Sequence, residues 1–123
     1  LTDAQFKIFK DWRLRPAAFN KLLGDYPEYI TGLRIGNLLM LGTPCDFSGE
    51  FYAKLDSAAE ANGMQMMVTS FNGGYIGYIT PGKYYDVNHY ETQLMNWYGQ
   101  GVGEYLMDCM QMIIDHVSIN ERK

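Results

Sequence analysis

Hydrophobic and polar positions along the chain follow the helix period in some segments and the strand period in others. Apolar residues recur at helical spacing from Phe6 to Leu14, after a Thr2-Asp3 pair that can cap a helix, which predicts a first helix. Pro16 suits the first turn of a second helix, from Pro16 to about Leu23, and Gly24 suits its stop. Residues 26–29 are Tyr-Pro-Glu-Tyr and predict an extended connector.

The middle of the chain alternates apolar runs with one amphipathic stretch. Residues 33–41 predict a largely buried strand, or a hairpin if Gly36-Asn37 forms a turn. Residues 51–59 then carry apolar side chains at intervals of three and four, which predicts a helix ending at Asn62-Gly63. Residues 64–71 predict another buried strand. A strand, a helix and a strand in this order indicate a βαβ unit with parallel strands.

Two further helical segments follow. Residues 87–98 predict a partly helical segment with Tyr90, Leu94 and Trp97 on one side. Residues 102–117 predict a longer helix with an apolar stripe of Leu106, Cys109, Met110, Ile113 and Val117. Methionine stripes of this kind are typical of cores, so they indicate no cofactor. The pattern predicts an α/β fold, with a partial βαβ sheet layer and flanking helices, that forms one incomplete unit over residues 1–123.

Composition and charge narrow the classes of function. The chain has 123 residues, of which 47% are hydrophobic, enough to form a folded core. The formal net charge is -4 and no stripe of lysine or arginine is present, which disfavours nucleic acid as a partner. The longest apolar runs, such as residues 38–41, are far shorter than the roughly 20 residues of a membrane span.

The first residues of the chain indicate a fragment, and its two cysteines do not indicate a set of disulfide bonds. The chain begins with Leu1-Thr2-Asp3, without an initiator methionine or a signal sequence, and we expect it to be a piece of a longer protein. Cys45 and Cys109 are too few for a disulfide framework, and we expect two buried free thiols.

A tyrosine-rich loop follows the second predicted strand and holds the candidate chemistry. Residues 72–80 are Asn-Gly-Gly-Tyr-Ile-Gly-Tyr-Ile-Thr, and their glycines allow sharp turns. Phenol oxygens can donate or accept hydrogen bonds and, when ionised, can bind metal. Ligands of parallel sheets gather at the carboxyl ends of strands, where both this loop and Asp46 are expected. The same sequence also fits a surface turn with aromatic packing.

The loop and its flanks resemble the neutral/alkaline (non-lysosomal) ceramidase family. The family motif is Asn-x-Tyr-x-x-Tyr-(Ile/Val)-Thr, followed by a proline and a Tyr-Glu pair. Tyr75, Tyr78 and Tyr90-Glu91 match it, with one extra glycine in the loop. Trp97-Tyr98-Gly99 is similar to the family's Leu-Tyr-Gly. The resemblance covers about residues 33–99 and implies the C-terminal part of a larger α/β catalytic domain.

The resemblance also implies roles for individual residues. In the family, a strand leads to a Pro-Gly-Glu-Phe turn whose glutamate binds zinc. Here the turn is Pro44-Cys45-Asp46-Phe47, so Asp46 takes the ligand position with a shorter carboxylate. Tyr78 matches a tyrosine that binds zinc. Tyr90 matches a tyrosine that stabilises the oxyanion of the substrate amide, which makes it both catalytic and substrate-binding, and Tyr75 joins it as a substrate-binding residue.

The implied activity is zinc-dependent hydrolysis of an N-acyl amide such as ceramide, a lipid amide. In the family, histidines from the N-terminal remainder of the protein complete the zinc site, so this remainder is the expected partner. The chain itself has His89, expected on an exposed loop, and His116, expected near the C-terminal end of a helix. We therefore expect the isolated chain to be inactive and to bind zinc weakly or not at all.

The alternative hypothesis is a non-catalytic binding or scaffold module with a degraded metal site, which the departures at Cys45 and Asp46 favour. In either case, apolar faces left uncovered predict self-association of the isolated chain. The resemblance alone suggests a secreted or periplasmic protein.

Overall fold

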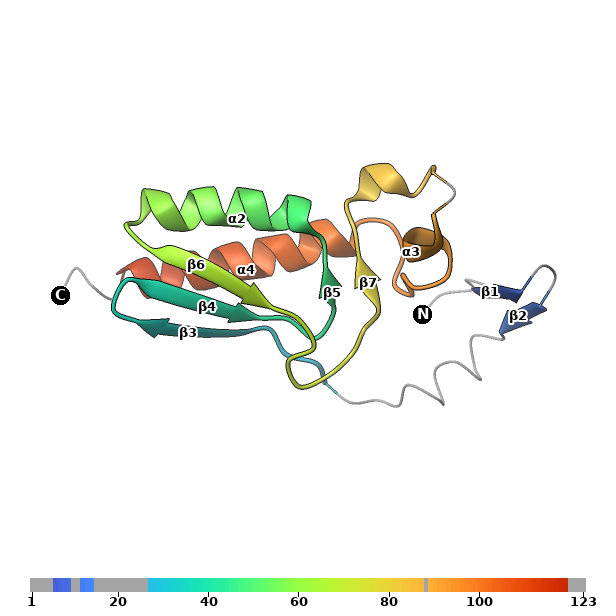
Figure 1. Cartoon of the computed structure of the whole chain (residues 1–123), viewed down its shortest axis with the longest axis horizontal. Coiled ribbons are helices and arrows are strands. Elements are labelled where there is room, and N and C mark those ends of the chain that lie inside the picture. Colours follow the sequence, from blue (N-terminus) through green and yellow to red (C-terminus); the bar gives the residue numbers. More distant parts are fainter. Residues whose placement is uncertain (1–5, 10–11, 15–26, 88, 120–123) are drawn as a thin grey trace.

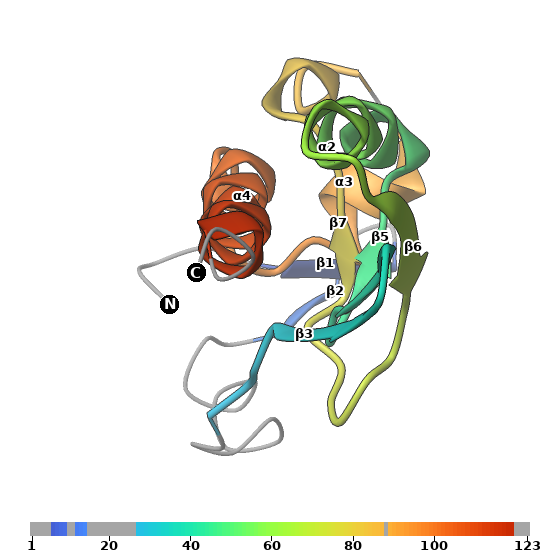
Figure 2. The ribbon, with the colours of Figure 1, turned by 90° about the vertical axis from the view of Figure 1, so that its left-hand side faces the viewer.

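The structure is a computed structural model that describes residues 6–9, 12–14, 27–87 and 89–119. Its main part is a curved three-stranded sheet with two helices on its concave face (Figures 1 and 2). The fold class is α/β, as predicted from the sequence. The strands are β1 (Phe6–Phe9), β2 (Trp12–Leu14), β3 (Thr31–Ile35), β4 (Leu38–Gly42), β5 (Asp46–Phe47), β6 (Gln65–Thr69) and β7 (Tyr78–Ile79), and the helices are α2 (Gly49–Ala61), η1 (Gly82–Tyr84, a 3-10 turn), α3 (Tyr90–Gln93) and α4 (Val102–Ile119).

The first predicted helix is wrong, because β1 and β2 form an antiparallel hairpin in which Phe6 pairs with Leu14. Apolar residues spaced by three fit the helix period. However, this segment contains three aromatic residues and the β-branched Ile8, and residues of both kinds favour strands. The second predicted helix, residues 16–23, lies outside the described residues.

The hairpin alternative for residues 33–41 is confirmed. Strands β3 and β4 are antiparallel, and Ile35 pairs with Leu38 across a two-residue loop. Gly36, the first residue of that loop, has a φ of 60°, a conformation that glycine adopts without steric cost. The turn therefore fixes the register that places alternate side chains of both strands on the same face.

The predicted βαβ unit is also confirmed. Strands β4 and β6 are parallel, with Leu39 opposite Met66, and α2 connects them. Helix α2 begins after Ser48, whose hydroxyl accepts a hydrogen bond from the Glu50 N–H at 3.4 Å. Its last carbonyls are bonded by the N–H groups of Asn62 and Gly63, where the sequence predicted the stop.

Two connected clusters form the core. The first packs the inner face of the sheet against α2 and α4, and its fully buried members include Leu39, Leu41, Leu55 and Met110. Each fully buried leucine of this kind contributes about 2 kcal/mol to folding. The second cluster joins the short strands β5 and β7 to the same two helices through Cys45, Phe51, Ile76, Ile79 and Leu106. The packing of these two helices therefore positions the β5–β7 region.

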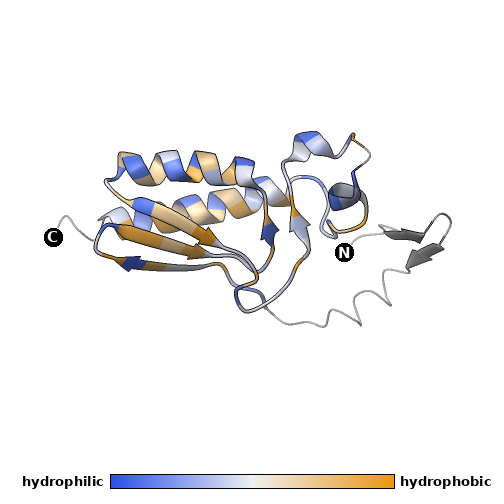
Figure 3. Cartoon of the chain, viewed as in Figure 1, coloured by the Kyte–Doolittle hydropathy of each residue, from blue (hydrophilic) through white to orange (hydrophobic). Residues whose placement is uncertain are grey.

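The outer face of the three-stranded sheet is open. Leu33 and Ile35 of β3 are 56% and 62% exposed, and Met67 of β6 is 41% exposed. The expectation of largely buried strands therefore holds for one face only, although apolar residues dominate both β4 and β6 (Figure 3). On the inner face, Gly32 of β3 lies so close to Ile113 of α4 that an added Cβ would be 2.5 Å from the Ile113 Cγ2 atom.

Helix α4 confirms the strongest helical prediction, and α3 confirms that residues 87–98 are partly helical. Among the described helices, none combines the length and the apolar character that a membrane crossing requires.

The two cysteines are free thiols that differ in burial. Cys45 is buried, as predicted, whereas Cys109 is only half-buried.

Candidate functional site

Strands β5 and β7 place the two predicted metal ligands side by side. They form a parallel two-stranded sheet in which Asp46 is the register partner of Tyr78. The Asp46 N–H donates to the Gly77 carbonyl at 3.0 Å, and the Ser48 N–H donates to the Ile79 carbonyl at 3.1 Å. The prediction that Asp46 and the tyrosine loop emerge at one edge of the fold is therefore confirmed.

The tyrosine loop is fixed to the turn after β4 by backbone hydrogen bonds. The Asn72 N–H donates to the Thr43 carbonyl at 2.9 Å, and the Ile76 N–H donates to the Pro44 carbonyl at 2.7 Å. The Thr43 N–H in turn donates to the Thr69 carbonyl at 2.9 Å. The turn that carries Asp46 and the loop that carries Tyr75 and Tyr78 thus form one connected unit.

Gly77 allows the segment around Met95 to approach this unit. Its φ is 88°, and an added Cβ would lie 2.1 Å from the Met95 carbonyl oxygen. That oxygen accepts a hydrogen bond from the Tyr78 N–H at 2.9 Å. Only glycine fits such a close backbone approach, which brings the chain around α3 against β7.

The aromatic side chains of the loop and of α3 meet at this point. The Tyr78 and Tyr90 rings are 5.4 Å apart between centroids, at an interplanar angle of 68°. Tyr75 stacks on Phe71 at 5.4 Å and makes an edge contact with Trp97 at 5.5 Å. Edge-to-face contacts of this kind hold ring orientations beyond simple apolar burial. The three predicted site tyrosines therefore take part in three aromatic contacts, one between Tyr78 and Tyr90 and two made by Tyr75.

Hydrogen bonds with Tyr90 and with Asp46 raise the pKa of the Tyr78 hydroxyl well above its usual range. Burial raises the pKa of Tyr75, and the negative charge of Asp46 raises it further. Both effects favour the protonated form of the phenols and extend its range above the ordinary tyrosine pKa of about 10. Asp46, Tyr78 and Tyr90 thus form a hydrogen-bonded cluster. Tyr75 lies close enough for the negative charge of Asp46 to raise the pKa of its hydroxyl.

The cluster is open to solvent on the Tyr90 side. Tyr90 is 49% exposed, while Asp46, Tyr75 and Tyr78 are half-buried. Cys45, in contrast, belongs to the core, and burial raises the pKa of its thiol to about 11. A thiol that stays protonated is neither a good nucleophile nor a good metal ligand, so Cys45 does not extend the site.

The two histidines lie where the sequence predicted. His89 is exposed at the start of α3, next to Tyr90, and His116 is exposed in the last turn of α4. In the part of the chain that the structure describes, no three His, Cys, Asp or Glu residues are grouped to hold a metal ion. Catalytic zinc usually has three protein ligands, including imidazole. Asp46 and Tyr78 offer two converging oxygens, which fit zinc as part of a ligand set.

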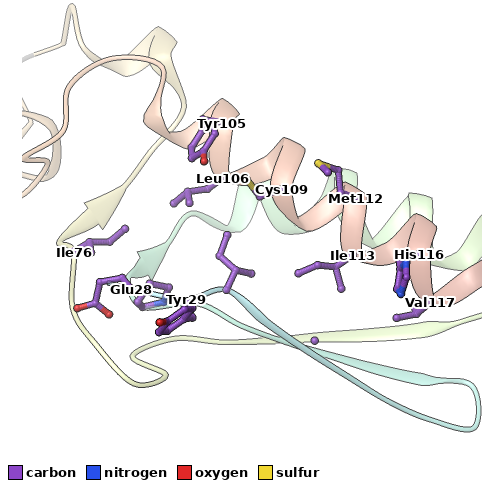
Figure 4. A pocket seen from close by; sticks show the side chains of 13 residues that line it. Glu28, Tyr29, Ile76, Tyr105, Leu106, Cys109, Met112, Ile113, His116 and Val117 are labelled. Atoms are coloured by element: carbon purple, nitrogen blue, oxygen red, sulfur yellow. The ribbon is translucent and has the colours of Figure 1, made fainter. Parts of the chain in front are cut away.

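A large apolar groove of about 750 Å³ was not predicted from the sequence. It lies between α4 and the connector before β3, and Ile76 of the tyrosine loop lines one end (Figure 4). Its α4 wall carries Tyr105, Cys109, Met112 and His116. These residues are spaced by four, three and four, so they form a second helical stripe, which shares Cys109 with the predicted apolar stripe. That spacing is the sequence signal that could have indicated the groove.

Comparisons with known protein families and with curated proteins find no match for this sequence. Two solved ceramidase structures do match it. The neutral ceramidase from Pseudomonas aeruginosa is 25% identical with a TM-score of 0.51, and the match covers 71% of this chain. A ceramidase complexed with C2 is 27% identical with a TM-score of 0.51, and the match covers 76% of this chain. The chain spans about 15% of the length of each.

These matches show a partial, ceramidase-like similarity in fold. They agree with the family resemblance carried by Tyr75, Tyr78 and Tyr90-Glu91. The placement of the chain in the C-terminal part of a catalytic domain stays a prediction.

Proposed function

We propose that this chain forms one wall of the active site of a zinc-dependent amidohydrolase of the neutral ceramidase type. The observation that carries the proposal is the hydrogen-bonded cluster of Asp46, Tyr78 and Tyr90. The family resemblance implies two zinc ligands and an oxyanion donor at these positions. The similarity in fold to two ceramidase structures supports the same proposal.

Asp46 and Tyr78 would hold the zinc ion, together with histidines from the N-terminal remainder of the protein. Bound zinc would polarise the amide carbonyl and lower the pKa of a bound water. In the free cluster, Tyr78 keeps its proton through hydrogen bonds to Tyr90 and Asp46. Zinc binding by Tyr78 therefore requires loss of that proton, which makes zinc affinity rise with pH.

Tyr90 would donate a hydrogen bond to the substrate carbonyl oxygen as negative charge develops on it. Its position suits this role because its ring contacts Tyr78 while half of its surface is open to solvent. Tyr75, held between Phe71 and Trp97, would contact the substrate beside it. The substrate class is an N-acyl amide of a lipid, with ceramide as the leading example.

The test is an amidase assay on the full-length protein with a fluorescent N-acyl lipid amide, before and after removal of metal by a chelator. We expect turnover that is lost with the metal and restored by zinc. Asp46→Ala should lose both bound zinc and turnover. Thr31→Ala, an exposed change on β3, serves as the control and should keep both.

The second candidate is a binding or scaffold module without catalysis. The observation that favours it is the turn before β5, where Cys45 and Asp46 replace the glycine and the glutamate of the family turn. The Asp46 side chain is one methylene shorter than the family's glutamate. Full-length protein that folds but neither binds zinc nor hydrolyses amides would establish this alternative.

A further inference from the structure

The sequence contains two asparagine-glycine pairs, and the structure gives them different surroundings. Asn62-Gly63 follows the end of α2, and Asn72-Gly73 lies in the tyrosine loop between β6 and β7. All four residues are exposed. Because glycine has no side chain to shield its backbone nitrogen, that nitrogen can approach the side-chain amide of the preceding asparagine. Each pair is therefore a place where the asparagine can lose its amide.

The side chains of the two asparagines are both anchored. The Asn62 Nδ2 atom donates to the Ala58 carbonyl at 2.9 Å, and the Asn72 Nδ2 atom donates to the Thr69 carbonyl at 2.9 Å. Asn72 also hydrogen-bonds the Thr69 hydroxyl. A higher reactivity of Asn72 therefore has to come from its backbone.

The two backbones differ at the glycine nitrogen. The Gly63 N–H donates to the Glu60 carbonyl at 2.9 Å, which holds it at the end of α2. Among the described residues, none accepts a hydrogen bond from the Gly73 N–H. An added Cβ at Gly73 would also have nothing within 4 Å. The Gly73 nitrogen can therefore turn toward the asparagine before it without breaking a hydrogen bond, whereas the Gly63 nitrogen must first leave the helix end.

We propose that Asn72 is the preferred deamidation site of this chain. The Gly73 nitrogen attacks the Asn72 Cγ atom and loses its proton to water, while the Cγ–Nδ2 bond breaks and the nitrogen leaves as ammonia. Water then opens the resulting succinimide ring at either carbonyl, which gives aspartate or isoaspartate. The net change is hydrolysis of the side-chain amide by water, without oxidation or reduction.

Either product changes the tyrosine loop. Aspartate at position 72 removes the amide donor to the Thr69 carbonyl, and isoaspartate adds a methylene to the backbone. Phe71, directly before this position, has a φ of 61°, which is unfavourable for a residue with a side chain. A longer backbone lets Phe71 leave that conformation. Because the Phe71 ring stacks on Tyr75, the change reaches a predicted site residue.

The test is mass spectrometry of the full-length protein after incubation in neutral buffer. Trypsin releases residues 55–83 as a single peptide that contains both pairs, so fragmentation of this peptide measures both sites in the same sample. In the folded protein, we expect Asn72 to deamidate about tenfold faster than Asn62, the scale of the hydrogen bond that the Gly63 N–H must break. In urea, where neither glycine nitrogen is held, the two rates should be similar.

Equal rates in the folded protein, faster loss at Asn62, or no reaction at either site while the urea sample reacts would overturn the proposal. The effect on the loop is tested by carbon NMR of labelled tyrosine. Asn72→Asp should shift the Tyr75 signals, whereas Asn62→Asp, the matched change at the other pair, should not. Unchanged Tyr75 signals in Asn72→Asp would refute that effect. None of these outcomes involves zinc or turnover of a substrate, so the proposed function keeps its own test.

Discussion

The Tyr78 hydroxyl connects a carboxylate on one strand with a second phenol on α3. Asp46 and Tyr90 both hydrogen-bond it, and both interactions favour its protonated form. The sequence could predict that Asp46 and Tyr78 lie together, because both follow parallel strands of a βαβ unit. It could not predict the direct register pairing, since β5 and β7 are only two residues each and have no detectable period.

The first prediction concerns the titration of Tyr78. Its raised pKa means that the folded state favours the neutral phenol, so this contribution to stability is present below about pH 10, the ordinary tyrosine value, and is lost as the pH rises further. Carbon NMR of labelled tyrosine should show Tyr78 titrating above an ordinary tyrosine. Tyr90→Phe and Asp46→Asn should each lower its pKa. A Tyr78 pKa that neither change affects would contradict the cluster.

The second prediction concerns Tyr90 in the full-length protein. Tyr90→Phe removes the hydroxyl proposed to stabilise the oxyanion, so kcat should fall about 100-fold while zinc content stays at the wild-type value. Metal analysis and steady-state kinetics on the same preparation check both parts. Unchanged kcat would exclude the oxyanion role, and loss of zinc would show that Tyr90 supports the metal site instead.

At the scale of elements, the sequence predicted a helix or strand correctly where the spacing of its apolar residues and the turn residues at its ends indicated the same structure. Residues 51–59 combine an amphipathic pattern with a capping serine and a glycine stop, and α2 forms there. Residues 6–14 have a helical spacing but strand-forming residues, and a hairpin forms instead. Burial of residues 33–41 was overestimated, because no layer among the described residues packs on the outer face of β3, where Leu33 and Ile35 are exposed.

The third prediction tests the close approach at Gly77. Gly77→Ala forces a left-handed residue and a contact with the Met95 carbonyl, and should destabilise the protein by about 3 kcal/mol. Gly73→Ala is the matched control, because Gly73 has a similar φ of 78° but nothing within 4 Å of an added Cβ. It should cost about 1 kcal/mol. Urea denaturation measures both, and equal losses would show that the approach to Met95 is not tight.

At the scale of the whole molecule, the helices cover one face of the sheet and leave the other open. Five strand-spaced residues of that outer face are apolar: Leu33, Ile35, Leu38, Met40 and Met67. The outer positions of the three strands include no charged residue. Sheets with parallel strands usually have both faces covered, and an open apolar face favours association.

The fourth prediction is weak self-association of the isolated chain through this outer face. A face of three short strands buries far less than the roughly 800 Å² per partner of a stable dimer, so the association should depend on concentration. Light scattering should show a mass that rises with concentration. Leu33→Lys combined with Ile35→Lys should abolish the rise, while Tyr105→Lys, on the groove side of α4, should not. The reverse pattern would place the contact at the groove.

The central claim is that Asp46 and Tyr78 share one zinc ion in the full-length protein. Anomalous diffraction at the zinc absorption edge, on crystals of that protein, tests it directly. We predict a single strong peak within coordination distance of the Asp46 carboxylate and the Tyr78 hydroxyl, about 2.0 to 2.2 Å for the carboxylate. A zinc peak bound elsewhere, or no peak while Asp46 and Tyr78 still hydrogen-bond each other, would contradict the claim.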